Sequence, residues 1–318
     1  MDTMRERFWS VAAALLDTDP RIAVVLADIS ADAFAQARRR HPDRVVNLGI
    51  REQLLISVAG GMALAGMRPI AHTFASFLVE RPFEQIKLDL THQNVGAVLV
   101  SSGASFDYSA AGRTHQSPGD VALLSTLPGW TVQVPGHPDE AATMLRSAAA
   151  TSGRVYLRLS ALANSAPLAR DGEEFTVLRR GTQATVVAVG PVADAVLEAA
   201  SGMDVTVLYA PTVRPFDRHT LRATLGAPVV VLVEPYLAGT SVPEVASALA
   251  DLPHRVLGLG VSREELRRYG TPEEHLAAHG LDAASLRERI AGFIDAGRVT
   301  CMPGEADSRH RRPARSMA

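Results

Sequence analysis

Short runs of β-branched and other apolar residues alternate along this chain with longer runs in which apolar residues recur at helical spacing. In the first half, the short runs are residues 21–27, 69–73, 97–101, 130–135 and 154–159, and the longer ones are residues 53–67 and 83–90. Strands that are apolar on both faces are typical of parallel sheets covered by helices on both sides. The alternation therefore predicts an α/β fold built on mostly parallel sheets.

The same alternation resumes after a polar stretch. Residues 163–180 include Asn164, Ser165 and Pro167 together with a charged run, and this composition predicts a linker between domains. We therefore expect two doubly wound domains, at residues 1–162 and 181–301. The remaining residues, 302–318, are rich in Pro, Arg and Ser, which predicts a disordered tail.

Composition narrows the class of protein. The 318 residues suit about two domains, and the formal net charge of −2 gives no reason to expect nucleic acid or an anionic membrane as partner. The single cysteine, Cys301, excludes an intrachain disulfide and fits a reducing cytosol. The first ten residues lack the apolar core of a signal peptide, and the longest apolar stretches fall far below the roughly 20 residues of a membrane span. We expect a cytoplasmic protein.

Glu52 is the first candidate for chemistry, because it starts the helical run that follows residues 47–51. An acid at a helix start is common, since the macrodipole favours it by about 0.3–1 kcal/mol. The apolar neighbours Ile50, Leu54 and Leu55 nevertheless favour a buried position. Burial disfavours the charged form of a carboxylate, so that a buried acid can share a proton with a ring nitrogen near neutral pH.

His115 is the second candidate. It lies between Thr114 and Gln116, in a loop rich in Gly, Ser and Ala that follows the strand-like run 97–101. An inert surface histidine is one interpretation of this position. The other is a functional one, because sites cluster at the carboxyl ends of parallel strands, where a histidine can shuttle a proton or donate to a substrate oxygen.

Two phenylalanines and an arginine follow the strand-like run 69–73. Phe74 and Phe77 either pack in the core or form the wall of an apolar cleft on which a heteroaromatic ring stacks. Arg81, next to Pro82, either binds an anion or caps a helix. The sequence contains no GxGxxG, P-loop, CxxC or HExxH spacing, and its histidines show no metal-ligand pattern, so we expect no metal ligands in this chain.

Taken together, these segments resemble the transketolase family and its relative deoxyxylulose phosphate synthase, from about Arg5 to about Ile294. The motifs that carry the resemblance are residues 47–53 (Asn-Leu-Gly-Ile-Arg-Glu-Gln), 73–77 (Thr-Phe-Ala-Ser-Phe), 114–116 (Thr-His-Gln), 269–276 (Tyr-Gly-Thr-Pro-Glu-Glu-His-Leu) and 280–281 (Gly-Leu). Each motif is weak by itself, but their order and spacing are specific. The resemblance implies a pyrimidine-binding fold for thiamine diphosphate, followed by a transketolase C-terminal-like domain.

The resemblance also implies roles for the candidates. Glu52 is similar to the acid that hydrogen-bonds the pyrimidine ring of thiamine diphosphate and so activates the cofactor. Phe77, with Phe74, is similar to the wall on which that ring stacks, and Asp28 is similar to a second contact to the cofactor. His115 is similar to the histidine that faces the ketose donor. The second domain serves assembly by the same analogy.

Three positions depart from the family pattern. Ala111 replaces an acid, Gly103 replaces a histidine, and Ala161 replaces an arginine that grips phosphate. These departures put the usual pentose phosphate substrates in doubt. The cations that remain nearby as candidate contacts to an anionic substrate are Arg81, Arg113 and Arg158.

The diphosphate- and metal-binding domain of the family, with its Gly-Asp-Gly…Asn motif, has no counterpart in the sequence. The resemblance therefore implies a separate N-terminal subunit that supplies this half, with thiamine diphosphate and Mg²⁺ shared between the subunits of an α2β2 assembly. We expect a two-component transketolase that moves a two-carbon ketol unit from a ketose to an aldehyde. One alternative is the β subunit of a 2-oxoacid dehydrogenase-like, acyl-transferring enzyme, which activity on pyruvate would reveal. The other is a non-catalytic scaffold, which has no use for Glu52 and His115.

Overall fold

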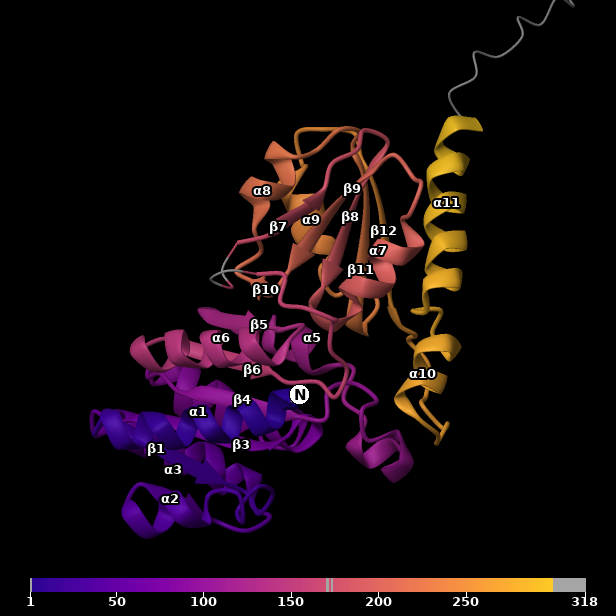
Figure 1. Cartoon of the computed structure of the whole chain (residues 1–318). Helices are drawn as coiled ribbons and strands as arrows, with labels where there is room; N and C mark the ends of the chain where they lie inside the picture. The colour runs from indigo at the N-terminus through magenta and orange to yellow at the C-terminus, as the bar shows by residue number, and fades with distance from the viewer. Residues whose placement is uncertain (1, 170–171, 173, 300–318) are drawn as a thin grey trace, which may run out of the picture.

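Two β-sheets organise the chain in the computed structural model, which describes residues 2–169, 172 and 174–299 (Figure 1). The first sheet has the strand order β10-β5-β6-β4-β3-β1-β2 and the second has the order β12-β11-β8-β9-β7. All neighbouring strands are parallel except β10, which is antiparallel to β5, and β7, which is antiparallel to β9. This arrangement confirms the predicted α/β class and the predicted mostly parallel sheets.

The first sheet is formed by β1 (Ile22–Leu26), β2 (Val45–Asn47), β3 (Arg68–Phe74), β4 (Val98–Ser102), β5 (Trp130–Gln133), β6 (Arg154–Arg158) and β10 (Thr212–Arg214). Helices α1 (Met4–Thr18) and α6 (Pro138–Ala150) share a buried cluster on one face with Val24, Ile70 and Val98. Helices α3 (Glu52–Leu64) and α5 (Asp120–Leu124) cover the other face, against Val25, Ala71 and Leu99. Alternate residues of one strand thus point to opposite faces of the sheet, and helices cover both faces. This explains why the strand sequences are continuous apolar runs.

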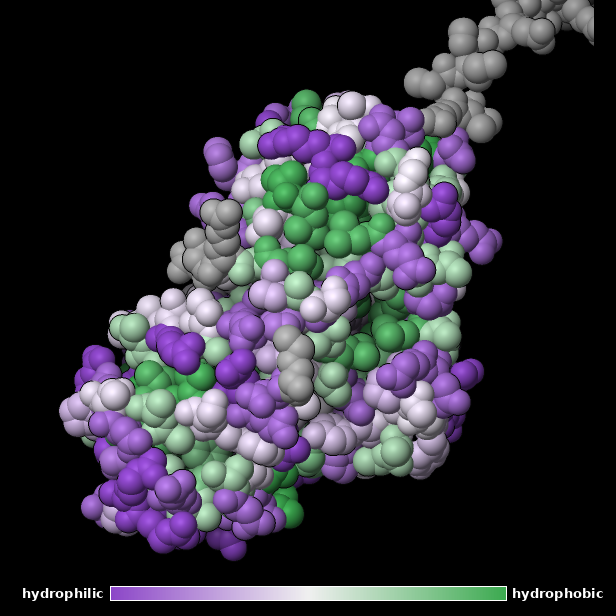
Figure 2. Space-filling view, viewed as in Figure 1, coloured by the Kyte–Doolittle hydropathy of each residue, from purple (hydrophilic) through white to green (hydrophobic). Residues whose placement is uncertain are grey.

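The second sheet is formed by β7 (Thr176–Arg179), β8 (Ala184–Val189), β9 (Val205–Ala210), β11 (Val229–Leu237) and β12 (Arg255–Val261). Helices α7 (Ala193–Ala199) and α11 (Ala283–Val299) cover one face, and α8 (Arg218–Ala223) and α9 (Val242–Ala248) cover the other. Helix α10 (Pro272–Ala278) lies beside the first half, below α11 in Figure 1. Figure 2 shows hydrophobic side chains gathered at the surface over this sheet, between hydrophilic margins.

The two halves are joined by more than the connecting segment. β10 follows five elements of the second half in the chain, yet it completes the edge of the first sheet. One apolar cluster also runs through both halves, since it contains Val132 and Val134 of the first and Val189 and Leu232 of the second. A continuous core of this kind holds the halves in a fixed relation.

Two predicted segments differ from the structure, and a third lies outside the described residues. The predicted linker, residues 163–180, contains strand β7, because its residues pair with β9 at a half-buried sheet edge. The predicted helix 83–90 is a short α4 (Phe83–Gln85) continued by a π-helical turn, Ile86–His92. The predicted tail, residues 302–318, lies outside the described residues. Within the described ranges, every helix is too short or too polar to span a bilayer.

Candidate functional site

Glu52 is buried at the first turn of α3, where its side chain is 1% exposed. The helix is drawn close to its neighbour because Gly60 presents no side chain, and a Cβ there would lie 2.7 Å from the Asp89 carbonyl oxygen. The Oε2 atom of Glu52 accepts a hydrogen bond of 2.6 Å from Arg81. The other oxygen, Oε1, is buried and has no hydrogen-bond partner. A buried carboxylate oxygen without a partner is costly, so this atom is available to a ligand.

The turn before Glu52 is fixed by Asn47. Its Oδ1 atom accepts hydrogen bonds from the backbone N–H groups of Asp28, at 3.0 Å, and of Gly49, at 3.1 Å. Gly49 has φ +69°, a conformation that favours glycine. Asp28, a predicted cofactor contact, lies exposed just beyond the end of β1 and is tied through its backbone to the turn that leads to Glu52.

Phe74, Phe77 and His115 form an aromatic cluster beside Glu52. Phe74 ends β3, and Phe77 lies in the π-helical turn Ser76–Glu80 that follows. The His115 ring centroid lies 5.2 Å from that of Phe74 and 5.0 Å from that of Phe77, both edge to face. Both phenyl rings are only half-buried. The structure therefore brings these candidates together at the carboxyl edge of the first sheet, where parallel sheets carry their sites.

Arg81 joins the cluster in a way that the sequence did not show. Its guanidinium carbon lies 3.9 Å from the centre of the Phe77 ring, and its Nη1 donates to Glu52. The side chain is 37% exposed. Two roles were predicted for Arg81, an anion contact and a helix cap. The geometry fits the anion contact, but the anion is the Glu52 carboxylate of the same chain.

The loop that carries His115 is held by the second half of the chain. Ser109 donates to the Gly270 carbonyl at 2.6 Å, and Gln116 donates to the Arg268 carbonyl at 3.1 Å. Arg113, a predicted substrate contact, donates instead to Glu265 at 3.0 Å. The second half thus positions the loop of His115. The family resemblance implied only an assembly role for this half.

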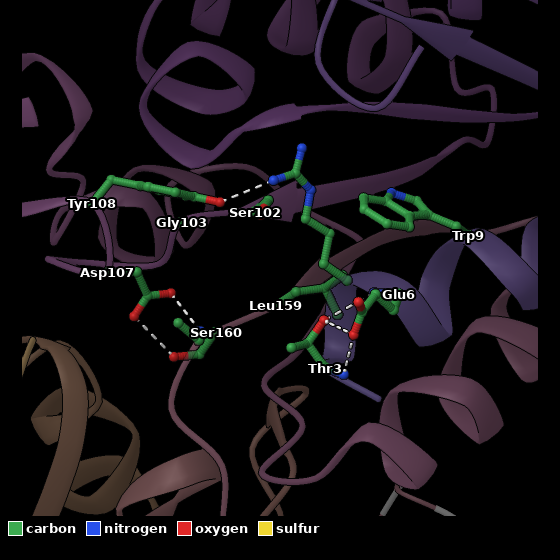
Figure 3. Close-up of a pocket in the computed structure, with 11 residues that line it drawn as sticks. Thr3, Glu6, Trp9, Ser102, Gly103, Asp107, Tyr108, Leu159 and Ser160 are labelled. Atoms are coloured by element: carbon green, nitrogen blue, oxygen red, sulfur yellow. Dashed lines mark hydrogen bonds between the residues drawn. The ribbon is translucent and has the colours of Figure 1, made fainter. Parts of the chain in front are cut away.

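A pocket of about 260 Å³ opens beyond this cluster (Figure 3). Its walls come from the start of α1, the ends of β4 and β6, and the loop after β4, and they include Arg5, Asp107 and Tyr108. The Tyr108 ring lies 4.8 Å from Phe74, which connects the pocket to His115. Arg5 donates to the Tyr108 hydroxyl at 3.1 Å and to Ser30 Oγ at 3.1 Å. Sequence reasoning missed these residues, which come from three distant segments and belong to no motif.

The pocket also explains one departure from the family pattern. Gly103 has φ +76°, and a Cβ there would lie 2.7 Å from Cε2 of Tyr108. Tyr108 therefore fills the space that a larger side chain at position 103 would need. Asp107 accepts hydrogen bonds from Ala161 N, at 2.8 Å, and from Ser160 Oγ, at 3.1 Å. Burial raises the pKa of Asp107 to about 6.

Arg158 is not available to a substrate. It is 1% exposed and donates to Asp120 Oδ2 at 2.7 Å and to Ser105 Oγ at 2.7 Å. Tyr156 donates to the same Asp120 oxygen at 2.6 Å. The expectation that Arg158 could contact an anionic substrate is therefore wrong, because a buried arginine needs this carboxylate as its partner. Among the described residues, no group of three or more His, Cys, Asp or Glu side chains is arranged to hold a metal ion.

Fold and site together are those of an α/β protein with a buried acid and half-exposed aromatic rings at the carboxyl edge of its first sheet. Residues 2–164 match the family model for the transketolase pyrimidine-binding domain, and residues 173–286 match the model for the transketolase C-terminal domain. The chain belongs to the transketolase family.

Similar proteins cover the chain almost end to end. A Rhodococcoides fascians protein described as an uncharacterized 33.6 kDa protein in the fasciation locus is 55% identical over 90% of this chain and 93% of its own length. One of the subunits of the apulose-4-phosphate transketolase of Actinobacillus succinogenes is 30% identical over 89% of this chain and 94% of its own. A solved structure titled split gene transketolase, inactive beta4 tetramer, is 28% identical, with a TM-score of 0.79 over 93% of this chain and 99% of that one.

Some relatives are longer. The chain spans 42% of the 1-deoxy-D-xylulose-5-phosphate synthase of Synechococcus sp. (strain WH7803), to which it is 33% identical over 81% of its own length.

Proposed function

We propose that this chain is the C-terminal subunit of a two-component transketolase, which transfers a two-carbon ketol unit from a ketose donor to an aldehyde acceptor. The observation that carries the proposal is Glu52, a buried carboxylate with one unpartnered oxygen, which Arg81 joins to Phe77 and so to the cluster with His115. A scaffold has no reason to maintain such an arrangement, because an unsatisfied buried oxygen destabilises the fold.

The residues present fit the pyrimidine ring of thiamine diphosphate. Glu52 Oε1 would hold a proton at a ring nitrogen, because a buried acid with one free oxygen is suited to that exchange. Phe77 and Phe74 would stack against the ring and exclude water. Asp28 would support this region through the Asn47 turn. When bound, the cofactor would supply a nucleophilic carbon for addition to the ketose carbonyl.

His115 is the residue proposed to act on the substrate. Its Nδ1 atom lies 2.9 Å from Thr114 Oγ1, which fixes the orientation of the ring and leaves the other nitrogen for a substrate oxygen. Arg113 is proposed to hold the loop of His115 in place, since its side chain donates to Glu265 of the second half.

The remaining half of the cofactor site is proposed to come from an N-terminal subunit that binds the diphosphate and Mg²⁺, in a cytoplasmic α2β2 assembly. Support comes from relatives: one is named as a single subunit of a transketolase, and the solved structure at 28% identity is titled as an inactive assembly of β chains alone. A β chain that is inactive without its partner is what a shared site predicts.

Reconstitution tests the proposal. The chain is co-expressed with a diphosphate-binding transketolase subunit from the same genome, and the purified complex is supplied with thiamine diphosphate, Mg²⁺, a ketose and an aldehyde. We expect a product lengthened by two carbons, together with a ketose donor shortened by two. Release of CO₂ from pyruvate without ketol transfer would instead favour the 2-oxoacid dehydrogenase-like alternative. A stable complex with neither activity would favour the scaffold.

A further inference from the structure

The guanidinium of Arg81 contacts both Phe77 and Glu52, two of the residues proposed to bind the cofactor ring. It stacks 3.9 Å from the centre of the Phe77 ring and donates a 2.6 Å hydrogen bond to Glu52. A guanidinium is flat, carries N–H donors along its edge and binds both aromatic faces and carboxylates. These are also the two contacts that an aminopyrimidine ring makes when it stacks on a phenyl ring and pairs with an acid. Arg81 therefore resembles the ring in shape and in both partners.

The two occupants exclude each other. A ring stacked on the face of Phe77 that Arg81 covers needs the volume that the guanidinium fills. The hydrogen bond from Arg81 also holds the Glu52 carboxylate with which the ring is proposed to pair.

We propose that Arg81 occupies the pyrimidine-ring position of the free chain and must leave the face of Phe77 before the cofactor ring can stack there. The inference rests on the proposed function, since it assumes that this site takes thiamine diphosphate. It makes Arg81 an internal competitor of the cofactor. It also gives Glu52 a partner in the free chain, where a buried carboxylate with both oxygens unsatisfied would destabilise the fold.

The surroundings allow this movement. The Arg81 side chain is 37% exposed, whereas that of Glu52 is 1% exposed, so the arginine can move into solvent and the acid cannot. The Arg81 backbone is held on both sides, because its N–H donates to the Ser76 carbonyl at 3.3 Å and its carbonyl accepts from Gln53 at 3.3 Å. A rotation of the side chain therefore opens the site without refolding the turn. Because the carboxylate stays buried when the arginine moves away, the ligand has to replace the arginine as its partner.

Competition of this kind lowers the apparent cofactor affinity by the fraction of molecules in which the site is open. One ion pair and one cation–π contact together suggest a roughly 5- to 30-fold effect. Removing the guanidinium should therefore tighten binding, which is the reverse of what is expected for an arginine that contacts an anionic ligand.

The test measures binding of thiamine diphosphate with Mg²⁺ to the reconstituted complex, by titration calorimetry and by stopped-flow association. Arg81→Met removes the charge and the planar donor but keeps much of the apolar stem. Arg81→Lys keeps the charge and loses the plane. Arg51→Met is the matched control, because Arg51 is exposed, precedes Glu52 directly and carries the same charge. Thermal unfolding of the isolated chain checks that each variant folds.

We expect Arg81→Met to lower the Kd of the complex for thiamine diphosphate by roughly 5- to 30-fold and to speed association. Arg81→Lys should lie between this variant and the wild type, and Arg51→Met should leave the Kd unchanged or raise it. An Arg81→Met complex that folds and binds the cofactor as weakly as the wild type, or more weakly, would overturn the inference. A wild-type complex that binds no thiamine diphosphate would overturn the proposed function, and the inference with it.

Discussion

Two buried glutamates show how differently one residue type is used within this chain. Glu52 and Glu234 are both at most 1% exposed, and each has one carboxylate oxygen without a hydrogen-bond partner. Glu52 lies among half-exposed rings beside a displaceable arginine. Glu234 lies inside β11 and accepts a hydrogen bond from the Ser241 backbone at 3.0 Å, where it fixes the connection to α9. The half-exposed neighbours of Glu52, and not burial, separate this candidate catalytic acid from the structural Glu234.

For Glu52, we expect Glu52→Gln to abolish turnover in the reconstituted complex while leaving assembly intact. Glutamine keeps the shape of the side chain but cannot share a proton with a ring nitrogen, so the loss should be about 10²–10⁴-fold, the scale of proton-transfer catalysis. Hydrogen exchange at the reactive carbon of the bound cofactor, followed by NMR, measures the step directly. Near-normal exchange in the variant would reduce Glu52 to a helix-start acid.

For Glu234, stability should depend on pH. Burial raises its pKa from 4.5 to about 7, so the folded state holds a proton that the unfolded state releases. Stability from this group is therefore fully present below about pH 4.5 and declines as the pH rises to about 7, by at most about 3 kcal/mol. Denaturant unfolding at several pH values should show a shallower decline for Glu234→Gln than for the wild type. Glu288→Gln, at an exposed position of α11, is the control and should leave the slope unchanged.

At the scale of elements, α3 carries two adjacent glycines with opposite roles. Gly60 faces the neighbouring π-helical turn, where a Cβ would lie 2.7 Å from the Asp89 carbonyl oxygen, whereas a Cβ on Gly61 would meet no atom within 4 Å. Of these two glycines, only Gly60 is required by the close packing of α3. The absent side chain lets the helix that begins at Glu52 approach the turn that follows Arg81.

This pair gives a matched test. In the isolated chain, we expect Gly61→Ala to stabilise the fold by about 0.5–1 kcal/mol, because alanine is the better helix former. Gly60→Ala should destabilise it by about 1–3 kcal/mol, since a backbone atom has to shift. Urea unfolding of both variants measures the difference. Equal effects of the two substitutions would contradict the tight contact at Gly60.

The loop after β4 makes a prediction about substrates. The adjoining pocket contains one arginine, already bound to Ser30 and Tyr108, and the carboxylate Asp107, so it offers a terminal phosphate little attraction. We expect the complex to prefer ketoses or aldehydes without a terminal phosphate, and Asp107→Asn to raise kcat/KM selectively for phosphorylated substrates. Kinetics on matched phosphorylated and unphosphorylated sugars decide this. A KM for xylulose 5-phosphate far below that of every unphosphorylated ketose would show the prediction to be wrong.

The elements also show what a single sequence reveals. The central strands were predictable because burial on both faces leaves a continuous apolar run, as in β1 and β4. β7 was missed because its four residues are all half-buried at a sheet edge and carry no such run. Glu52, Phe74, Phe77 and His115 came from motifs, and the structure brings them together. Arg81 contacts both Phe77 and Glu52, and Glu52 lies 29 positions earlier in the chain. No local sequence pattern encodes a contact of this kind.

At the scale of the whole molecule, the second half works with the first as one unit. Strand β10 completes the first sheet, a shared apolar cluster joins the halves, and the segment around Arg268 and Gly270 holds the loop of His115. The sequence placed a boundary between two domains and gave the second an assembly role. Contacts between residues more than 150 positions apart, such as Ser109 with Gly270, lie beyond what periodicity can predict.

The isolated chain should bind thiamine diphosphate weakly, for two independent reasons. The charge-assisted contacts to Mg²⁺ and diphosphate are proposed to come from the partner subunit, which the isolated chain lacks. The ring position is also covered by Arg81. Because the two deficits are independent, Arg81→Met should tighten binding by a similar factor in the complex and in the chain alone, while the chain alone remains the weaker binder. Titration calorimetry on both forms tests this, and tight, Mg²⁺-dependent binding by the isolated wild-type chain would contradict the two-subunit site.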